Sequence, residues 1–241
     1  MLKISVLIVA HNEEKNIRKC IESLKYQTIL PSEIVVVAHN CTDTTEDIIR
    51  EFTEVKLISY QGSRGVTFAR IEGFKHVEGE IIACIDGDSY AEKNWLKEIT
   101  RPFYNQDIAG VGTVVVYTGS LFSRLVSFKH FYMISFLNVI LGKYGKFYFF
   151  GPSFAVRKND YKLSGGFEPF IELRKKLHLK NWPDDCYLSL VLLRKGKVVL
   201  VRKKQTRVFA KAKNLGLYGI FIRPFEQMID GKKLFDYFKN E

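Results

Sequence analysis

Residues Glu80–Tyr90 have the sequence EIIACIDGDSY, which is the most informative segment of the chain for its fold class. Its apolar run Ile81–Ile85 predicts a strand that is buried on both faces. The run ends at Asp86 and Asp88, on either side of Gly87, and two carboxylates at the end of a buried strand need a cation or solvent to compensate their charge. Carboxylate oxygens suit Mg²⁺ or Mn²⁺, and these ions suit a diphosphate. The alternative for an isolated Asp-Gly-Asp is a plain acidic turn, so the surrounding sequence has to decide.

Strands and helices are predicted to alternate along the first half of the chain. Apolar runs predict strands at 4–9, 34–37, 55–59, 81–85 and 111–117, and helical spacing predicts helices after a cap at Asn12, after the polar loop 39–43, and at about 63–76 and 94–104. This alternation predicts right-handed βαβ units and a Rossmann-like, mostly parallel sheet flanked by helices. Ligands of such sheets bind beyond the carboxyl ends of the strands. Polar clusters fall at three of these ends, at 10–12, 39–40 and 86–88, and predict one shared site.

The usual glycine-loop motifs are absent from the sequence. It contains no G-x-G-x-x-G for a dinucleotide, no G-x-x-x-x-G-K-[ST] for a nucleoside triphosphate and no G-x-S-x-G nucleophile elbow. The pattern that remains is a metal-assisted nucleotide site without a glycine loop.

The basic charge of the chain lies in its second half. The 241 residues carry a net charge of +11, yet residues 1–120 have 13 basic and 17 acidic groups, while residues 121–193 have 11 and 5 and residues 194–241 have 13 and 4. A basic half favours an anionic membrane surface, phosphorylated substrates or nucleic acid, and a solvated face is the alternative. The acidic first half and the paired aspartates argue against nucleic acid and for an enzyme.

Cysteine usage and hydropathy predict a cytoplasmic protein, either free or peripheral at the cytoplasmic face of the membrane. The four cysteines are scattered without zinc-ligand spacing, which indicates reduced thiols. The apolar stretch at the N-terminus is too short for a signal peptide. No apolar run reaches the roughly 18–20 residues of a membrane span.

An acidic pair, Asp184-Asp185, opens a helix that is predicted after Pro183. Its carboxylates favour the positive end of that helix, and N-capping by Asp184 is the structural alternative to a catalytic role. Two aromatic segments, 128–141 and 215–238, each have two interpretations: a helix that packs in the protein core, or a helix that lies on a membrane surface.

Residues 4–119 resemble the nucleotide-sugar half of the family 2 glycosyltransferases, which have the GT-A fold. The resemblance rests on four stretches, SVLIVAHNEEKNI, EIVVVAHNCTDTTEDI, GSRGVTFARIEGF and GEIIACIDGDS. It implies that His11 lies against the nucleobase of a nucleotide-sugar donor. Asn12 and Glu13 would help to shape the nucleobase pocket, beside Ala10.

The same resemblance implies how the phosphates of the donor and a metal are bound. Arg70 would lie close to the nucleotide, with Arg64 as the second candidate. Asp86 would face the ribose and the metal, with Gly87 leaving room for the close approach of the backbone. Asp88 would bind the Mn²⁺ or Mg²⁺ that bridges the diphosphate.

The acidic pair of the second half also has a counterpart in the family. The second member of that pair is the general base there, so the resemblance implies this role for Asp185. Asp184 stands where glutamate is commoner and would orient the site. No Q-x-x-R-W motif follows the pair, so the sequence does not resemble the processive polymerases of the family.

One departure from the family concerns the nucleobase. The family usually carries an acidic pair after the second strand, and the second Asp reads the edge of the base. This sequence has Ala38 and His39 at those positions. A neutral imidazole donates one hydrogen bond and stacks, so base contact and ordinary loop packing are both open for His39. The identity of the base is left open as well.

Together these features predict a GT-A-like domain over residues 1–214, with a nucleotide-sugar half at 1–119 and an acceptor half at 120–214, followed by a basic aromatic tail at 215–241. We expect a metal-dependent, inverting, non-processive glycosyltransferase that moves a sugar to a hydroxyl or phosphate of a glycan or lipid-linked acceptor. The first alternative is a sugar nucleotidyltransferase, which normally carries a glycine-rich basic loop where this chain has HNEEKN. The second is a non-catalytic module that binds a membrane surface.

Overall fold

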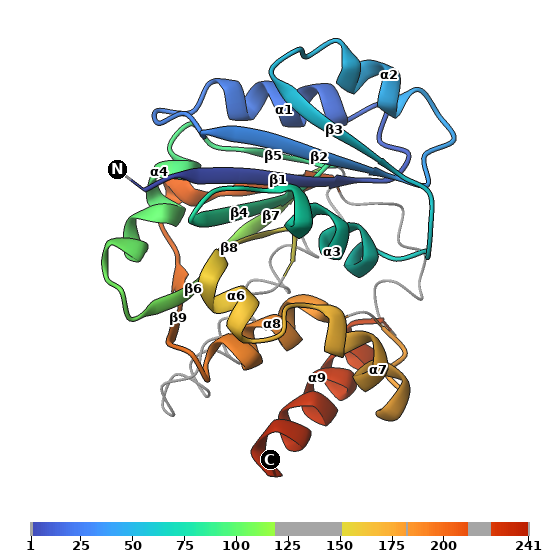
Figure 1. The fold of residues 1–241 in the computed structure, drawn as a ribbon, viewed down its shortest axis with the longest axis vertical. Coiled ribbons are helices and arrows are strands. Elements are labelled where there is room, and N and C mark those ends of the chain that lie inside the picture. The colour runs from blue at the N-terminus through green and yellow to red at the C-terminus, as the bar shows by residue number, and fades with distance from the viewer. Residues whose placement is uncertain (1, 119–150, 182, 212–222, 241) are drawn as a thin grey trace.

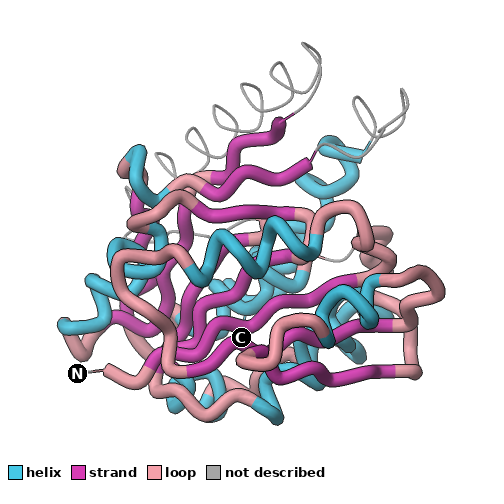
Figure 2. Tube along the Cα trace, turned by 90° about the horizontal axis from the view of Figure 1, so that it is seen from above, coloured by secondary structure: helices cyan, strands magenta, loops and turns pink. Residues whose placement is uncertain are grey.

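The computed structural model describes residues 2–118, 151–181, 183–211 and 223–240. Its centre is a seven-stranded sheet in the order β3-β2-β1-β4-β8-β6-β9 (Figure 1). The strands are β1 (Ile4–Ala10), β2 (Glu33–His39), β3 (Val55–Tyr60), β4 (Ile81–Asp86), β6 (Ile108–Thr113), β8 (Ser153–Arg157) and β9 (Lys197–Val201). The first four pair in parallel, as the sequence predicted, and Figure 2 shows the strands side by side.

Each face of the sheet is covered by its own helices and its own apolar cluster. One face carries α1 (Ile17–Lys25), α2 (Thr45–Arg50), α4 (Trp95–Thr100) and the 3₁₀ turn η1 (Arg101–Tyr104), and the other carries α3 (Val66–His76), α6 (Lys158–Leu163), α7 (Glu168–Lys176), α8 (Asp184–Leu192) and α9 (Arg223–Asn240). Along β4, Ile82 and Cys84 belong to the α3 side, while Ile81 and Ile85 belong to the α1 side. The strand is therefore buried on both faces, as its composition predicted.

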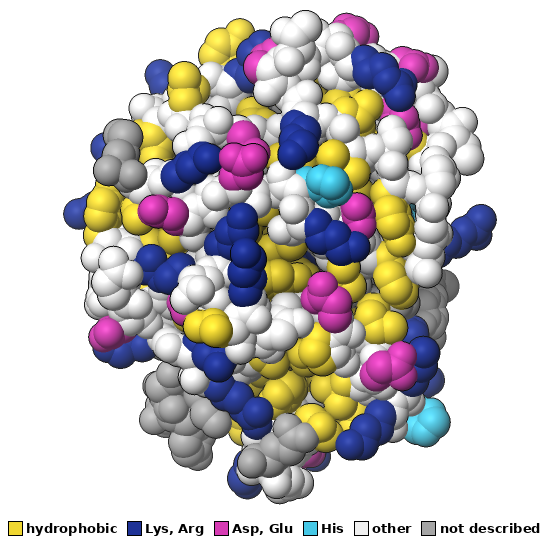
Figure 3. Space-filling view, in the orientation of Figure 1, with side chains coloured by type: hydrophobic (Ala, Val, Ile, Leu, Met, Phe, Trp, Pro, Cys, Tyr) yellow, Lys and Arg dark blue, Asp and Glu magenta, His cyan; other side chains and the backbone are white. Residues whose placement is uncertain are grey.

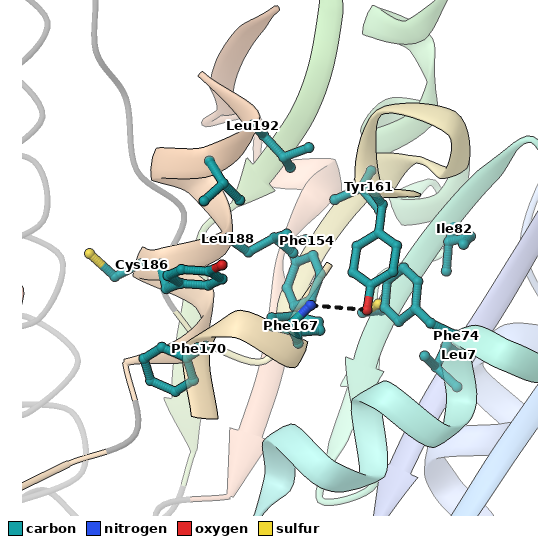
Figure 4. Close-up of a cluster of buried hydrophobic side chains, with 14 of the residues drawn as sticks. Leu7, Phe74, Ile82, Phe154, Tyr161, Phe167, Phe170, Cys186, Leu188 and Leu192 are labelled. Carbon is teal, nitrogen blue, oxygen red and sulfur yellow. Dashed lines mark hydrogen bonds between the residues drawn. The ribbon is translucent and has the colours of Figure 1, made fainter. Parts of the chain in front are cut away.

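Helix α3 lies close against the sheet and joins the two halves of the chain. A Cβ atom at Gly73 would lie 2.4 Å from a methyl carbon of Leu7, so the absent side chain allows this approach. The rings of Phe74 and Tyr161 stack with their centroids 3.9 Å apart. Figure 4 shows the Tyr161 hydroxyl accepting a hydrogen bond from the backbone N–H of Phe167. These contacts hold α3 against α6 and the start of α7.

The segment 111–117 forms parts of two strands rather than the predicted single strand. After β6, the chain enters β7 (Val115–Thr118), which belongs to a second sheet of three strands with β10 (Val208–Lys211) and β5 (Ser89–Ala91). The central sheet is mostly parallel, as predicted, and its antiparallel member is β8, which runs antiparallel to both β4 and β6. Local apolar patterns cannot predict this insertion, since β8 is remote in sequence from both neighbours.

Asn12 does not cap helix α1. The helix begins at Ile17 with Asn16 as its N-cap residue, and Asn12 has a φ angle of 53° in the left-handed region. Asparagine adopts this conformation more readily than most residues. The Asn12 carboxamide instead accepts a hydrogen bond of 2.8 Å from the backbone N–H of Thr42. The side chain thus joins two loops at the end of the sheet.

Helix α9 packs against the protein itself. Its Leu234 is fully buried, and Phe235 and Phe238 pack against the same apolar cluster as α3. For the described part of the tail, core packing is therefore what the structure has. The other aromatic segment, 128–141, lies outside the described residues. A short 3₁₀ turn, η2 (Lys204–Thr206), completes the described elements. None of the described helices combines the length and the hydrophobicity that crossing a membrane requires.

Candidate active site

The carboxyl ends of β1, β2 and β4 meet around a cavity of about 710 Å³. It is lined by every residue that the sequence analysis singled out for binding or catalysis: Ala10, His11, Asn12, Glu13, His39, Arg64, Arg70, Asp86, Gly87, Asp88, Asp184 and Asp185. The first half of the chain thus supplies the strand ends, and the start of α8 supplies the acidic pair. The remaining lining residues, which were not proposed for binding or catalysis, are Val9, Asn40, Thr42, Gly65, Val66, Ala69, Gly151 and Pro152, and of these Asn40 belongs to a predicted polar cluster. The loop residues among them carried one signal, a position next to strand ends, where functional residues concentrate. Val9 lies in β1, and Val66 and Ala69 lie in α3, so they carried no such signal.

The loop after β1 is fixed by bonds to the end of β2 and the start of α2, and by one bond within the loop itself. His11 donates from Nδ1 to the backbone carbonyl of His39 over 2.7 Å, because a carbonyl oxygen only accepts. The backbone N–H of Glu13 donates to the Thr45 hydroxyl over 2.8 Å, and one Glu13 carboxylate oxygen accepts from Asn16 at 2.7 Å. These bonds hold the rim of the cavity on the side that the resemblance assigns to the nucleobase.

His39 is a buried member of this rim, with a relative exposure of 6%. Its Nε2 donates to the backbone carbonyl of Ser63 over 3.1 Å, so a neutral ring has Nδ1 as its acceptor atom. The His39 ring also stacks on Tyr60, with the ring centroids 5.7 Å apart. The single donor of the neutral imidazole is thus already used within the protein.

Gly87 brings the two carboxylates of the Asp-Gly-Asp turn close to strand β1. Its backbone N–H donates to the carbonyl of Val9 over 2.8 Å, and a Cβ atom at Gly87 would lie 2.9 Å from the Cβ of Ala10. Burial raises the pKa of Asp86 to about 6, an effect that Arg70 opposes and the negative charge of Asp88 strengthens. The turn therefore carries more negative charge than its surroundings readily accommodate.

The oxygen atoms of this turn fit a divalent cation of the Mg²⁺ or Mn²⁺ type. Such ions are commonly bound by one or two carboxylates together with substrate phosphates and water. Asp86 and Asp88 supply two carboxylates, and the described residues contain no cluster of three or more ligating side chains. A cation at this turn would therefore depend on a bound diphosphate for its remaining ligands.

Arg70 links the Asp-Gly-Asp turn to the acidic pair of α8. Its guanidinium is buried, with Nη1 2.9 Å from Asp184 and Nη2 3.2 Å from Asp86. Burial alone would lower the pKa of Arg70, but the surrounding aspartates raise it above its ordinary value, so the group stays charged. Both terminal amino groups thus bind carboxylates of the protein. Arg64, in contrast, is exposed at the rim of the cavity.

The two aspartates at the start of α8 differ in their surroundings. Asp184 is buried, with a relative exposure of 2%. Asp185 lies at the cavity, where its Oδ2 accepts from the backbone N–H of Gly151 and its Oδ1 accepts from the backbone N–H of Cys186. Burial and the charge of Asp184 raise the pKa of Asp185 to about 7, which the two backbone bonds and Arg70 oppose. Asp185 is therefore the member of the pair suited to exchanging a proton with a bound molecule near neutral pH.

A match to a protein-family model supports the resemblance that the motifs indicated. The model of the family described as glycosyl transferase family 2 matches residues 5–163, which is more than half of the chain. The chain belongs to glycosyl transferase family 2. This membership confirms the resemblance and favours the glycosyltransferase over the two alternatives, a nucleotidyltransferase and a non-catalytic module.

Curated relatives of the chain are named glycosyltransferases, and each matches a part of it. The chain is 32% identical over 112 residues to glycosyltransferase GlyA of Streptococcus pneumoniae, covering 44% of this chain and 16% of the relative. It is 30% identical over 183 residues to the probable glycosyltransferase YdaM of Bacillus subtilis, covering 69% and 43%. Glycosyltransferase AglE of Haloferax volcanii is 29% identical over 140 residues, covering 54% and 46%. The chain thus spans less than half the length of these relatives.

Solved structures with the GT-A fold match the chain more completely. A mannosyltransferase from Pyrobaculum calidifontis, in complex with GDP-Man and Mn²⁺, gives a TM-score of 0.70 at 15% identity and covers 100% of this chain and 65% of its own. Glucosyl-3-phosphoglycerate synthase from Mycobacterium tuberculosis, in complex with Mn²⁺, UDP-glucose and phosphoglyceric acid, gives 0.64 at 15% identity and covers 99% and 80%. The predicted GT-A fold is therefore confirmed.

Proposed function

We propose that this chain transfers a sugar from a nucleotide-diphosphate donor to an acceptor hydroxyl or phosphate, with inversion at the anomeric carbon and without processive elongation. The observation that carries the proposal is that Asp86, Asp88 and Asp185 line one cavity at the end of the sheet. Carboxylates that suit a metal and diphosphate thus lie in the same cavity as a carboxylate that suits a general base. The family membership supports the same reaction class.

In this proposal each part of the cavity has a separate task. The loops with His11 and His39 bind the nucleobase, and Asp88 with Asp86 holds Mn²⁺ or Mg²⁺. When bound, that ion would supply a positive charge that binds the diphosphate and stabilises the leaving nucleotide. Asp185 accepts the proton of the acceptor hydroxyl as its oxygen attacks the anomeric carbon. Arg64 is exposed at the rim and is the candidate for contact with the phosphates.

The acceptor in this proposal is a glycan or a lipid-linked phosphate. Support comes from the basic residues of the second half, which suit an anionic acceptor or an anionic membrane surface. Basic side chains are spread among acidic and apolar ones on the face that Figure 3 shows, rather than gathered in one patch. A soluble anionic acceptor and a membrane lipid are therefore both candidates for the acceptor. A cytoplasmic location stays a prediction.

The experiment that tests the donor site is a thermal-shift screen of UDP-, GDP-, ADP- and dTDP-sugars, with and without Mn²⁺. We expect one nucleotide to raise the melting temperature only when Mn²⁺ is present. A specific ligand at a hundredfold excess over its dissociation constant stabilises a protein by about 2.7 kcal/mol. The sugar in the product formed from that donor, analysed by NMR, should have the anomeric configuration opposite to that of the sugar in the donor. No shift with any donor would overturn the proposed site.

The rate of transfer should depend on pH through Asp185. A general base works only when ionised, and burial with the charge of Asp184 raises the pKa of Asp185 to about 7. The turnover rate should therefore be low in acid, rise as the pH passes about 7 and level off above it. The measurement is the turnover rate at saturating donor and Mn²⁺ from about pH 5 to about pH 9.

Donor binding must be followed over the same pH range as a control. The pKa of Asp86 is raised to about 6, so protonation of Asp86 also weakens the metal site in acid. A turnover rate that stays flat from about pH 5.5 to about pH 8, with the donor bound throughout, would contradict a base of this pKa.

A further inference from the structure

Two side chains of helix α3, Thr67 and Arg70, bind the same oxygen of Asp184. The Thr67 hydroxyl donates to Oδ2 over 2.9 Å, and Arg70 Nη1 donates to Oδ2 over 2.9 Å. The two residues are three positions apart in α3 and therefore lie on one side of the helix. All three side chains are buried, with relative exposures of 0%, 4% and 2% for Thr67, Arg70 and Asp184. The contact joins residues that are 117 and 114 positions apart in the chain.

The other oxygen of Asp184 is also occupied. Its Oδ1 accepts a hydrogen bond of 3.1 Å from the backbone N–H of Asp185. Asp184 therefore ties the first turn of α8 to α3. One of its oxygens binds side chains of α3, and the other binds the backbone of the proposed base, Asp185. A carboxylate bound in this way is not directed at a substrate. The position of Asp184 therefore affects the position of the Asp185 backbone, and through it the position of the Asp185 carboxylate.

Arg70 extends the same connection to the donor side of the cavity. Its Nη2 lies 3.2 Å from Asp86, so one guanidinium spans the Asp-Gly-Asp turn and the acidic pair. The guanidinium also lies 5.3 Å from the ring centre of Phe154, and its Nε has no hydrogen-bond partner among the described residues. A buried ionic group of this kind contributes little net stability compared with apolar side chains of similar volume. Its presence calls for a reason other than stability.

We propose that Thr67 and Arg70 are positioning residues for the proposed reaction: by holding Asp184 they set the orientation of the base Asp185 relative to the Asp-Gly-Asp turn. The inference rests on the proposed function, because it explains how the base that this function requires, Asp185, is held in position. Neither residue needs to touch the donor or the acceptor. Thr67, Arg70 and Asp184 form a positioning unit. This unit acts through the backbone of α8, because Asp184 binds the N–H of Asp185 directly.

The first variant to test is Thr67→Val, which keeps the shape of the side chain and removes only the hydroxyl. We expect the turnover rate to fall about tenfold, because a general base that is displaced from its working geometry loses rate steeply. The Mn²⁺-dependent thermal shift with the donor should be unchanged, since Thr67 makes no described bond to the Asp-Gly-Asp turn. A turnover rate equal to that of the unaltered protein would overturn the inference.

Thr100→Val is the matched control. Thr100 is also a buried threonine, with a relative exposure of 4%, but its hydroxyl donates to Leu96 within its own helix α4 on the opposite face of the sheet. This variant should lose as much thermal stability as Thr67→Val and keep the full turnover rate. An equal loss of turnover in both variants would show a general effect of stability and would overturn the positioning role.

Two further variants test the charge of the unit. Arg70→Lys keeps one positive charge but cannot bind Asp184 and Asp86 at once, so turnover should fall further than in Thr67→Val. Asp184→Asn keeps an acceptor oxygen for α3 and removes the charge that raises the pKa of Asp185. The acid limb of the pH profile should therefore move to lower pH in Asp184→Asn alone. If the acid limb stays in place there, Asp184 does not act on Asp185.

The outcomes separate this inference from the proposed function. If the unaltered protein shows neither donor binding nor transfer, the proposed function fails. If it transfers sugar and Thr67→Val does so equally well, only the positioning role of α3 fails.

Discussion

Replacing Asp185 with asparagine is expected to reduce sugar transfer by about a thousandfold, because a general base typically contributes a factor of about 10²–10⁴. The carboxylate accepts a backbone N–H at each oxygen, from Gly151 and from Cys186. An asparagine has one carbonyl oxygen, so its NH₂ group would face one of these donors. The variant cannot accept a proton, while the donor side of the cavity keeps its carboxylates. The measurement is the turnover rate with the donor that the thermal-shift screen identifies.

The control for Asp185→Asn is Asp160→Asn. Asp160 is also an acidic residue in the first turn of a helix, α6, but it pairs with Arg157 and does not line the cavity. This variant should keep the full turnover rate. The thermal shift with donor and Mn²⁺ should persist in Asp185→Asn, which would separate lost chemistry from lost binding. Full activity of Asp185→Asn would remove Asp185 as the base.

Replacing Asp88 with alanine is expected to remove the Mn²⁺-dependent part of donor binding. Asp88 lines the cavity and directly follows Gly87, which lies close to strand β1. Together with Asp86 it supplies two carboxylates for a cation. Losing one of two protein ligands should weaken the metal-dependent affinity for the donor at least about 100-fold, since even indirect partners of metal ligands contribute a factor of about 10–100. Calorimetric titration of the donor with and without Mn²⁺ measures this loss.

Ser89→Ala is the matched control for Asp88→Ala. The Ser89 hydroxyl donates to Asp88 Oδ1 over 3.0 Å, so this variant alters the surroundings of the carboxylate and keeps the carboxylate itself. Its Mn²⁺-dependent affinity should fall far less than that of Asp88→Ala. If Asp88→Ala binds the donor as tightly as the unaltered protein, both with and without Mn²⁺, the metal site at this turn is wrong.

The parallel core of the first half could be predicted because its signals are local. The apolar run Ile81–Ile85 is long enough for a strand and has no polar face, which indicates burial on both sides. The neighbouring strands show the same composition. Parallel strands present their carboxyl ends at one edge, so the polar residues after them had to come together. This is why His11, His39 and Asp86 line one cavity.

Two features, one in each half of the chain, could be predicted less well, for a physical reason in each case. Strand β8 enters between β4 and β6 by pairing with strands remote in sequence, and a short apolar segment carries no mark of its partner or direction. Asn12 has the composition of a helix cap, but its bond to Thr42 in another loop holds it in a left-handed conformation. In both cases a tertiary contact outweighs the local preference.

The candidate site divides in the same way. The order of residues is enough to predict which residue types stand at the ends of the strands and that Asp184 and Asp185 open a helix, because strand ends and helix starts depend on the spacing of nearby residues. The folded arrangement adds that Asp184 is buried and bound by Thr67 and Arg70, while Asp185, at the same cavity, is only half-buried. The two aspartates are adjacent and chemically identical, so their difference comes entirely from what packs against them. Burial and neighbouring charge then set the pKa of Asp185, and both depend on the folded structure rather than on the order of residues in the sequence.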